Sequence, residues 1–306
     1  MKYVTVDPEL VSVLQDGKPV IALETTLITH GMPYPDNLLL ALENKASAES
    51  RGVYPAFIGI LAGKLKVGLQ DSELEYFATA ENIAKVSAQN LSYQLSSREA
   101  GATTVSATMI AARLCGIEVI ATGGIGGVHL DVNNSFDISP DLDELARTPV
   151  IVVSAGAKAI LDLARTLEYL ETRGIPVLGF RTDRFPAFYS AATELFITRV
   201  EEPQQIADAF LINKSLDMNR GMLVANPIPV TDEIPFPEIR EYSEKALYEA
   251  AALSVKGREL TPFLLGKIVE MTDGRALQAN KVLLKNNVEL ACTIAKELSR
   301  YEYQKV

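Results

Sequence analysis

Short apolar runs alternate with helical patterns along most of this sequence. Residues 150–153, Val-Ile-Val-Val, form the clearest run; small residues follow, and then a helical pattern that ends near Arg173, before Gly174. A strand buried on both faces gives such a run, and strands of parallel sheets are buried in this way. The alternation predicts an α/β fold in which a largely parallel, or mixed, sheet lies between layers of helices.

Predicted strands lie at 19–23, 56–61, 118–122, 150–153, 176–180, 195–200 and 222–227. Predicted helices lie at 36–51 with Asp36 as N-cap, from about Lys158 to 173, and at 203–218, 239–256, 261–271 and 277–301. From about residue 236 the pattern is helical only. We expect these last helices to pack on a single catalytic α/β domain that spans residues 1–306.

The chain carries a formal net charge of −10 over 306 residues. This excess of negative charge argues against nucleic acid or an anionic membrane as a partner. Cys115 and Cys292 lie in apolar helical patterns and are typical of the buried free thiols of cytosolic proteins. The N-terminal residues do not form a signal-peptide pattern, and no apolar stretch reaches ~20 residues, so we expect a soluble cytoplasmic protein.

Polar residues follow four of the predicted strands, at the end where each strand finishes. They are Glu24, the segment 122–137, Lys158 and Asn226. The carboxyl ends of parallel strands meet at one edge of the sheet, where open α/β sheets bind their ligands. We therefore expect these groups to converge on one active site.

The segment 122–137 begins with a glycine-rich turn, Gly123-Gly124-Ile125-Gly126-Gly127. It does not match the dinucleotide-binding pattern, because His129 stands where the third glycine belongs and a polar loop replaces the helix that should follow. Two interpretations stay open. The turn is either a strap of small residues whose backbone N–H groups approach a ligand, or a tight turn without a ligand.

Asp137, Ser139 and Asp141 form an oxygen-rich pattern after this turn. Hard cations prefer such oxygens, and one carboxylate with water ligands suits Mg²⁺ or Mn²⁺. Ser139 and Asp141 serve equally well as caps of the helix that follows, whereas Asp137 lies outside that cap and is the better metal candidate. Zinc is not expected, since the chain has only two histidines, His30 and His129.

Both histidines lie in loops beside glycines, where a donor to substrate and a structural hydrogen bond are equally good interpretations. Three asparagines, Asn280, Asn286 and Asn287, lie inside the last helical pattern. Asparagine is unfavourable in a helix interior. Each of these side chains therefore needs a reason, such as a buried hydrogen bond or a ligand.

Lys158 is a charge among small and apolar neighbours, where a predicted strand gives way to a helix. It can be a surface residue, a point charge for phosphate or a nucleophile. A nucleophilic lysine must be neutral, so its pKa must fall from an ordinary value of ~10.4. Burial, a cation such as Lys85 or a metal ion, and the expected helix N-terminus would act in this direction. A buried Glu24 would then be a general acid or base.

Several motifs resemble those of pseudouridine-5′-phosphate glycosidases, also called the indigoidine synthase A family. They occur in the family's order over almost the whole chain: L-E-T-T-L-I-T-H-G-M-P from Leu23, G-A-T-T-V-S-A-T-M from Gly101, A-T-G-G-I-G-G-V-H from Ala121, F-D-I-S-P-D-L from Phe136, S-A-G-A-K-A-I-L-D from Ser154, V-A-N-P-I-P from Val224 and T-P-F-L-L from Thr261. The resemblance implies a three-layer α/β/α fold and a homotrimer.

The resemblance also implies a reaction, the reversible cleavage of the C–C glycosidic bond of pseudouridine 5′-phosphate to uracil and ribose 5-phosphate. The family uses a covalent lysine adduct with the opened ribose. By motif, Lys158 matches the nucleophile, Glu24 the proton donor and Asp137 the ligand of Mn²⁺, for which Mg²⁺ is an alternative. The other matching positions bind substrate or line its pocket: Lys85, Val105, Thr122, His129, Ser139, Pro140, Asp141 and Asn280.

Two other functions stay open at this point. The same lysine would serve a Schiff-base, aldolase-like enzyme that acts on another sugar phosphate. The scaffold would also suit a protein that binds a sugar phosphate without catalysis.

Overall fold

The computed structural model describes residues 2–255 and 260–303, with side chains to residue 301. In this part of the chain one sheet of eleven strands has the order β1-β4-β3-β2-β7-β9-β13-β11-β12, and β6, which pairs with β3, carries β5. The strands are β1 (Val4–Val6), β2 (Val20–Glu24), β3 (Tyr54–Leu61), β4 (Lys64–Val67), β5 (Ala84–Val86), β6 (Gly101–Thr103), β7 (Val119–Ala121), β9 (Ile151–Ser154), β11 (Val177–Phe180), β12 (Thr198–Val200) and β13 (Met222–Ala225). Two further strands, β8 (Val128–His129) and β10 (Leu161–Asp162), pair separately.

The sheet is largely parallel, as predicted. From β3 through β2, β7, β9, β13 and β11 to β12, every strand is parallel to its neighbour. Antiparallel pairing occurs where β4 and β6 join β3. Every residue of β2, β9 and β13 is buried, which is why these strands read as uninterrupted apolar runs.

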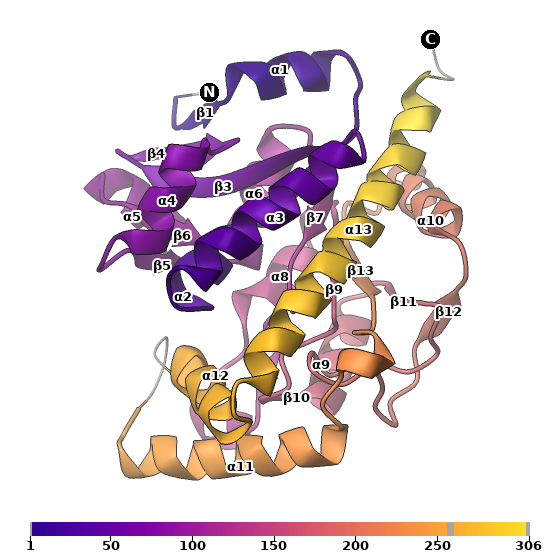
Figure 1. Cartoon of the computed structure of the whole chain (residues 1–306). Coiled ribbons are helices and arrows are strands. Elements are labelled where there is room, and N and C mark those ends of the chain that lie inside the picture. The colour runs from indigo at the N-terminus through magenta and orange to yellow at the C-terminus, as the bar shows by residue number, and fades with distance from the viewer. Residues whose placement is uncertain (1, 256–259, 304–306) are drawn as a thin grey trace.

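Helices cover both faces of this sheet. They are α1 (Pro8–Gln15), α2 (Thr26–His30), α3 (Asp36–Ser50), α4 (Asp71–Thr79), α5 (Leu91–Ser97), α6 (Val105–Leu114), α7 (Val132–Ser135), α8 (Pro140–Leu145), α9 (Leu163–Thr172), α10 (Pro203–Ser215), α11 (Phe236–Ala252), α12 (Leu260–Met271) and α13 (Arg275–Tyr303), with a 3₁₀ turn at Val230–Asp232. Helices α3 and α13 lie side by side in front of the sheet, and α6 and α8 lie behind it (Figure 1). The predicted three-layer α/β/α arrangement is confirmed.

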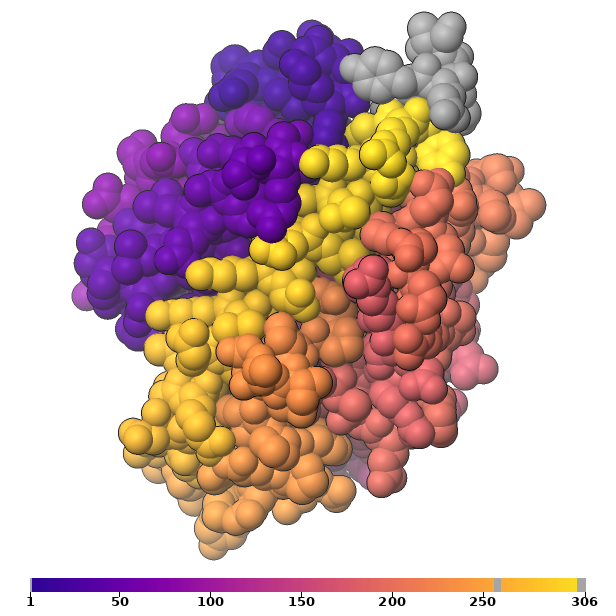
Figure 2. Space-filling view, turned by 45° about the vertical axis from the view of Figure 1, so that its right-hand side comes forward, coloured from indigo at the N-terminus to yellow at the C-terminus, as the bar shows by residue number. Residues whose placement is uncertain are grey.

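The last helix, α13, contacts elements from both the N-terminal and the C-terminal part of the chain. It contacts β2, β7 and β9 as well as α3 and α10, and α11 and α12 pack against each other beside its first turns. In the space-filling view the yellow helix runs between the N-terminal residues and the orange segments (Figure 2). Helix α13 therefore packs on the α/β layers, whereas the division of the chain into domains stays a prediction.

Four predicted boundaries differ from the structure. Lys158 does not lie in the first turn of a helix, because residues 155–160 form a turn and α9 begins only at Leu163. Pro35, not Asp36, is the N-cap of α3. The strand predicted at 195–200 is limited to β12. The helix predicted at 239–256 ends at Ala252, and residue 256 lies outside the described residues.

The first of these errors has a clear physical cause. The backbone N–H of Lys158 donates to the carbonyl of Ile125 at 3.1 Å, and Gly156 adopts a φ of +76°. These tertiary hydrogen bonds to the glycine-rich turn override the local helix propensity of the alanines in this segment.

Cys115 and Cys292 are free thiols. Cys292 is buried, as expected, whereas Cys115 is only half-buried. Among the described helices, none combines the length and the apolar character that a membrane crossing requires.

Candidate active site

A cavity of about 530 Å³ lies where the sequence predicts polar groups to converge. This volume is in the range of small-molecule sites. Nine of the predicted site residues line it: Glu24, Lys85, Val105, His129, Asp137, Ser139, Pro140, Asp141 and Lys158. They come from the end of β2, the middle of β5, the start of α6, the β8–α8 segment and the turn after β9. Of the groups expected to converge at the strand ends, Glu24, His129, Asp137 and Lys158 thus lie around one cavity, and Asn226 does not line it.

Glu24 is the last residue of β2 and is buried, with 7% of its surface exposed. One carboxyl oxygen accepts a hydrogen bond from the Thr122 hydroxyl. Burial raises the pKa of Glu24 from an ordinary 4.5 to about 7, against the opposing charge of Lys158. A carboxyl group with this pKa exchanges protons readily near neutral pH, as a general acid or base must.

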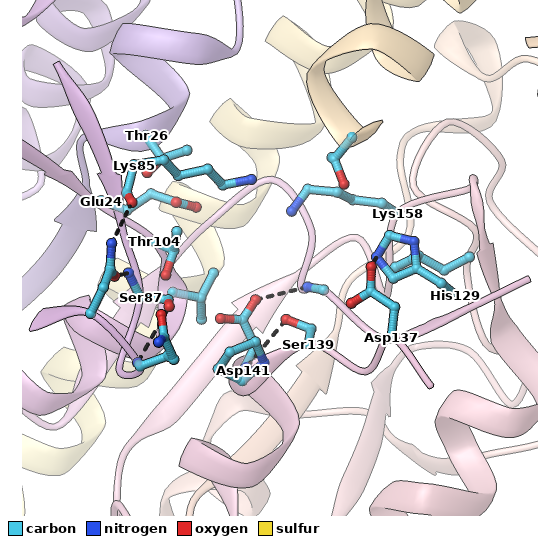
Figure 3. Close-up of a pocket in the computed structure, with 17 residues that line it drawn as sticks. Glu24, Thr26, Lys85, Ser87, Thr104, His129, Asp137, Ser139, Asp141 and Lys158 are labelled. Atoms are coloured by element: carbon cyan, nitrogen blue, oxygen red, sulfur yellow. Dashed lines mark hydrogen bonds and ion pairs between the residues drawn. The ribbon is translucent and has the colours of Figure 1, made fainter. Parts of the chain in front are cut away.

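Two lysines face Glu24 from different walls of the cavity. Figure 3 shows the side chains of Lys85 and Lys158 pointing toward one another across the space beside the Glu24 carboxyl. Burial lowers the pKa of Lys85, and the positive charge of Lys158 lowers it further. The expected helix N-terminus beneath Lys158 is absent, since Lys158 lies in a turn. A cation, Lys85, therefore lies near Lys158, whereas the argument from a helix dipole at Lys158 is wrong.

His129 and Asp137 form the wall beside Lys158. The antiparallel pair β8 and β10 places His129 opposite Leu161, which also lines the cavity. His129 Nε2 lies 3.8 Å from an Asp137 carboxylate oxygen. Burial lowers the pKa of His129 and the Asp137 charge opposes this, so the pair presents a donor and an anion to the cavity.

Asp141 binds two backbone segments at once. Its carboxylate oxygens accept hydrogen bonds from the N–H groups of Ser106 and Gly126, each at 2.9 Å. Ser139 is the N-cap of α8 and accepts a hydrogen bond from the Asp141 N–H, as one of the two interpretations predicted. A Cβ atom at Gly126 would overlap the Ser139 hydroxyl. The glycine-rich turn is therefore a strap packed tightly along the cavity wall.

Three predicted residues lie behind the cavity and do not line it. Thr122 holds Glu24, and Asn226 donates to Asn287. Asn280 is buried, and within the described residues its carbonyl oxygen lacks a hydrogen-bond partner. A contact of Thr122 or Asn280 with a substrate stays a prediction.

Gly126 of the glycine-rich turn also lines the cavity. Further lining residues were given no individual role from the sequence: Thr26, Ser87, Gln89, Asn90, Thr104, Leu161 and Thr261. Thr26 and Thr104 had a signal, since each follows a strand within a motif rich in hydroxyl groups. Thr261 is the first residue of the motif T-P-F-L-L, but nothing in the local pattern places it beside the other site residues. It lies in the first turn of α12, 100 residues beyond Leu161, and the tertiary fold brings it to the cavity.

Comparisons with known proteins identify the family. The family model described as "Indigoidine synthase A like protein" matches residues 9–297. A Solibacter usitatus protein named pseudouridine-5′-phosphate glycosidase is 49% identical over 297 residues, which cover 97% of this chain and 99% of that protein. A Staphylococcus aureus protein of the same name is 44% identical over 96% of both chains.

Two solved structures agree with this assignment. The prealnumycin C-glycosynthase AlnA, in complex with ribulose 5-phosphate, superposes with a TM-score of 0.92 at 34% identity and covers 99% of both chains. An indigoidine synthase A-like protein from Thermotoga maritima superposes with a TM-score of 0.90 at 39% identity and covers 97% of both chains. The chain therefore belongs to the indigoidine synthase A family.

Proposed function

We propose that this protein is an enzyme that reversibly cleaves the C–C glycosidic bond of pseudouridine 5′-phosphate, giving uracil and ribose 5-phosphate. One observation carries the proposal: a lysine amine and a buried carboxyl group with a pKa of about 7 face the same cavity. The names of relatives that are 49% identical over 97% of the chain suggest the substrate.

Lys158 is the nucleophile in this proposal and Glu24 is the acid. The neutral amine of Lys158 bonds to C1′ of the ribose, the C1′–O4′ bond breaks, and O4′ leaves with the electron pair. Protonated Glu24 gives its proton to O4′, so that the ring opens as an alcohol and not as an unstable alkoxide. The resulting carboxylate is positioned to take the proton that the lysine nitrogen loses.

The second half of the reaction releases the base. The lysine nitrogen forms an imine with C1′ while the bond from C1′ to uracil C5 breaks. The electron pair of that bond stays on uracil C5, which takes up the second proton that the lysine nitrogen loses as the imine forms. Water then hydrolyses the imine, releases ribose 5-phosphate and restores the Lys158 amine. The sum is one substrate and one water converted into two products.

We propose that the substrate phosphate binds at another wall, at the start of α6. Val105 begins α6 beside Thr104, whose side chain makes no capping hydrogen bond, and both residues line the cavity. Helix N-termini favour phosphate because their first N–H groups lack partners within the helix. We propose that this terminus, Lys85 and residues 139–141 bind the sugar phosphate, with His129 as a further donor.

Asp137 is the proposed ligand of Mn²⁺, or of Mg²⁺. Its side chain is 39% exposed and borders the cavity. The described residues contain no group of three or more His, Cys, Asp or Glu side chains that would enclose a metal. This arrangement fits a hard cation held by one carboxylate, water and substrate oxygens. When bound, the cation would neutralise negative charge on the substrate.

We also propose that the protein works in the cytoplasm as a homotrimer of one catalytic domain per chain. The family resemblance suggests the trimer, and the two free thiols suit a reducing compartment. Light scattering on the purified protein tests the assembly, since a molar mass near three chains is expected and the mass of one chain would refute it.

Two measurements test the reaction. Incubation with pseudouridine 5′-phosphate and Mn²⁺ should release free uracil. Borohydride reduction in the presence of ribose 5-phosphate should leave a pentose-phosphate adduct on Lys158, located by peptide mass spectrometry, and K158A should form none. An adduct without uracil release would instead indicate a Schiff-base enzyme for another sugar phosphate. Binding of ribose 5-phosphate that survives in K158A, with no turnover in the parent, would indicate a binding protein.

A further inference from the structure

Asn287 is an unusual residue for its position. It lies in the interior of α13, a helix of 29 residues, and is completely buried. Asparagine is a poor residue for a helix interior, and a buried amide is unfavourable unless it is hydrogen-bonded. The proposed reaction does not use this side chain, which does not line the cavity. Its hydrogen bonds indicate its role.

Those hydrogen bonds form a chain that ends on the proposed acid. Asn226 Nδ2 donates to Asn287 Oδ1 at 3.1 Å. Asn287 Nδ2 donates to the carbonyl of Thr122 at 2.8 Å and to that of Gly123 at 3.3 Å. The Thr122 hydroxyl in turn donates to Glu24 Oε1. This series of hydrogen bonds joins the end of β13, helix α13 and the ends of β7 and β2.

The geometry holds Thr122 from both sides of its backbone. Its N–H donates to the carbonyl of Val153 at 3.0 Å, and its own carbonyl accepts from Asn287. The donor from Asn226 fixes which end of the Asn287 amide faces Thr122, because only the oxygen of that amide accepts. The β-branched side chain of Thr122 is fully buried and has few rotamers. Its hydroxyl is therefore aimed at Glu24.

We propose that Asn287 is a positioning residue for Glu24, acting through the backbone and hydroxyl of Thr122. This inference rests on the proposed function, in which Glu24 supplies the proton. Loss of the amide would let residues 122–123 relax and would loosen the bond between the Thr122 hydroxyl and Glu24. Misplacement of a reacting group by about 1 Å is enough to cost up to ~100-fold in rate.

The chain offers a matched control in the next residue. Asn286 lies in the same helix, and its Nδ2 donates to the carbonyl of Pro227 at 2.8 Å. This hydrogen bond has the same chemistry but leads to a loop and not to Glu24. N286L and N287L therefore remove comparable amides, and only the second breaks the chain to the acid.

The pKa of Glu24 distinguishes the two possible roles of Asn287, because a residue that only stabilises the fold would leave this pKa unchanged. Glu24 is hydrogen-bonded by Thr122, and the charged groups that face it are Lys158, Asp141 and Lys85. The Thr122 hydrogen bond lowers the pKa of Glu24, because it stabilises the carboxylate. Loosening it raises that pKa, so that the acid stays protonated to higher pH.

Steady-state kinetics with pseudouridine 5′-phosphate test the proposal. In N287L we expect kcat to fall about tenfold or more, KM to change less than about twofold since Asn287 lies outside the cavity, and the basic limb of the kcat profile to move to higher pH. T122V should act in the same direction and T122S should restore the parent behaviour. Since both residues act through one hydroxyl, N287L should add little in a T122V background.

Two results would overturn the inference. One is an N287L protein with the kcat and pH profile of N286L, whatever its stability. The other is a multiplicative effect of N287L and T122V. If N287L does not fold, N226A can replace it, because this variant removes the donor that orients the Asn287 amide and should give a smaller change in the same direction. A parent-like kcat and pH profile in N226A would then refute the role of these hydrogen bonds.

Failure of the proposed function would be seen separately, as absence of uracil release by the parent protein. In that case, infrared difference titration of the protonated Glu24 carboxyl, identified by its loss in E24Q, replaces kinetics. The midpoint should lie near pH 7 in the parent, higher in N287L and T122V, and at the parent value in N286L. Equal midpoints in all four proteins would refute the role of Asn287.

Discussion

Replacement of Glu24 by glutamine should abolish turnover and yet stabilise the folded protein above neutral pH. The side chain keeps its size and can still accept the Thr122 hydrogen bond, but it no longer ionises in a buried site. The pKa of Glu24 rises from 4.5 to about 7. At about 1.36 kcal/mol per pH unit, this difference corresponds to a free energy of about 3 kcal/mol.

The sign of the effect follows from proton linkage. Below pH 4.5 the carboxyl is protonated in both the folded and the unfolded chain, so E24Q gains nothing there. As the pH rises toward 7, the unfolded chain ionises freely while the folded protein holds the proton, and stability declines. Above pH 7 the parent carries the full penalty of a buried charge, which E24Q lacks.

Urea unfolding of the parent and E24Q at pH 4.5 and pH 8 measures the difference. E24Q should be more stable by about 3 kcal/mol at pH 8 and by little at pH 4.5. An E24Q advantage that is absent at pH 8, or independent of pH, would refute the assignment of a raised pKa.

Glu144 provides a control for this experiment. It is also buried, but it has an ion-pair partner, Arg147, at 3.3 Å and accepts a hydrogen bond from Thr148. Removal of one partner from a satisfied buried group is destabilising. E144Q should therefore lose stability at pH 8, where E24Q gains it.

Three further predictions concern the cavity. K158A should show no uracil release and no borohydride-trapped adduct, because the amine that bonds to C1′ is gone; measurable turnover would exclude the covalent route. G126A should lose about 1–3 kcal/mol of unfolding free energy and most of its kcat, because its Cβ would overlap Ser139 and lie 3.0 Å from Asp141 Oδ2. G116A is the control and should keep its kcat, since φ is also positive there, at +77°, but a Cβ meets nothing within 4 Å. Chelation should lower activity and Mn²⁺ should restore it, and D137N should need about tenfold more Mn²⁺ or greater; an unchanged Mn²⁺ requirement in a titration of initial rates would remove Asp137 as ligand.

Much of the fold and half of the chemistry were predictable from local pattern. Residues 150–153 are apolar because β9 is buried on both faces, and burial likewise explains why the apolar runs of β2 and β13 were predicted as strands. Parallel strands bring their carboxyl ends to one edge, so Glu24 and Lys158 had to approach one another once the strands were known. Burial of a carboxyl group at such an end raises its pKa by desolvation alone.

The tertiary structure decided what distant backbone segments do to each other. The turn at residues 155–160 replaces the expected helix because Lys158 bonds to Ile125 in the glycine-rich strap, a contact that no local pattern encodes. Thr261 enters the cavity from a helix 100 residues beyond Leu161. Asn287 looked only misplaced in its helix until the fold set it beside Thr122. Periodicity reports which side of an element is buried, whereas the partners of a buried polar group depend on packing between elements.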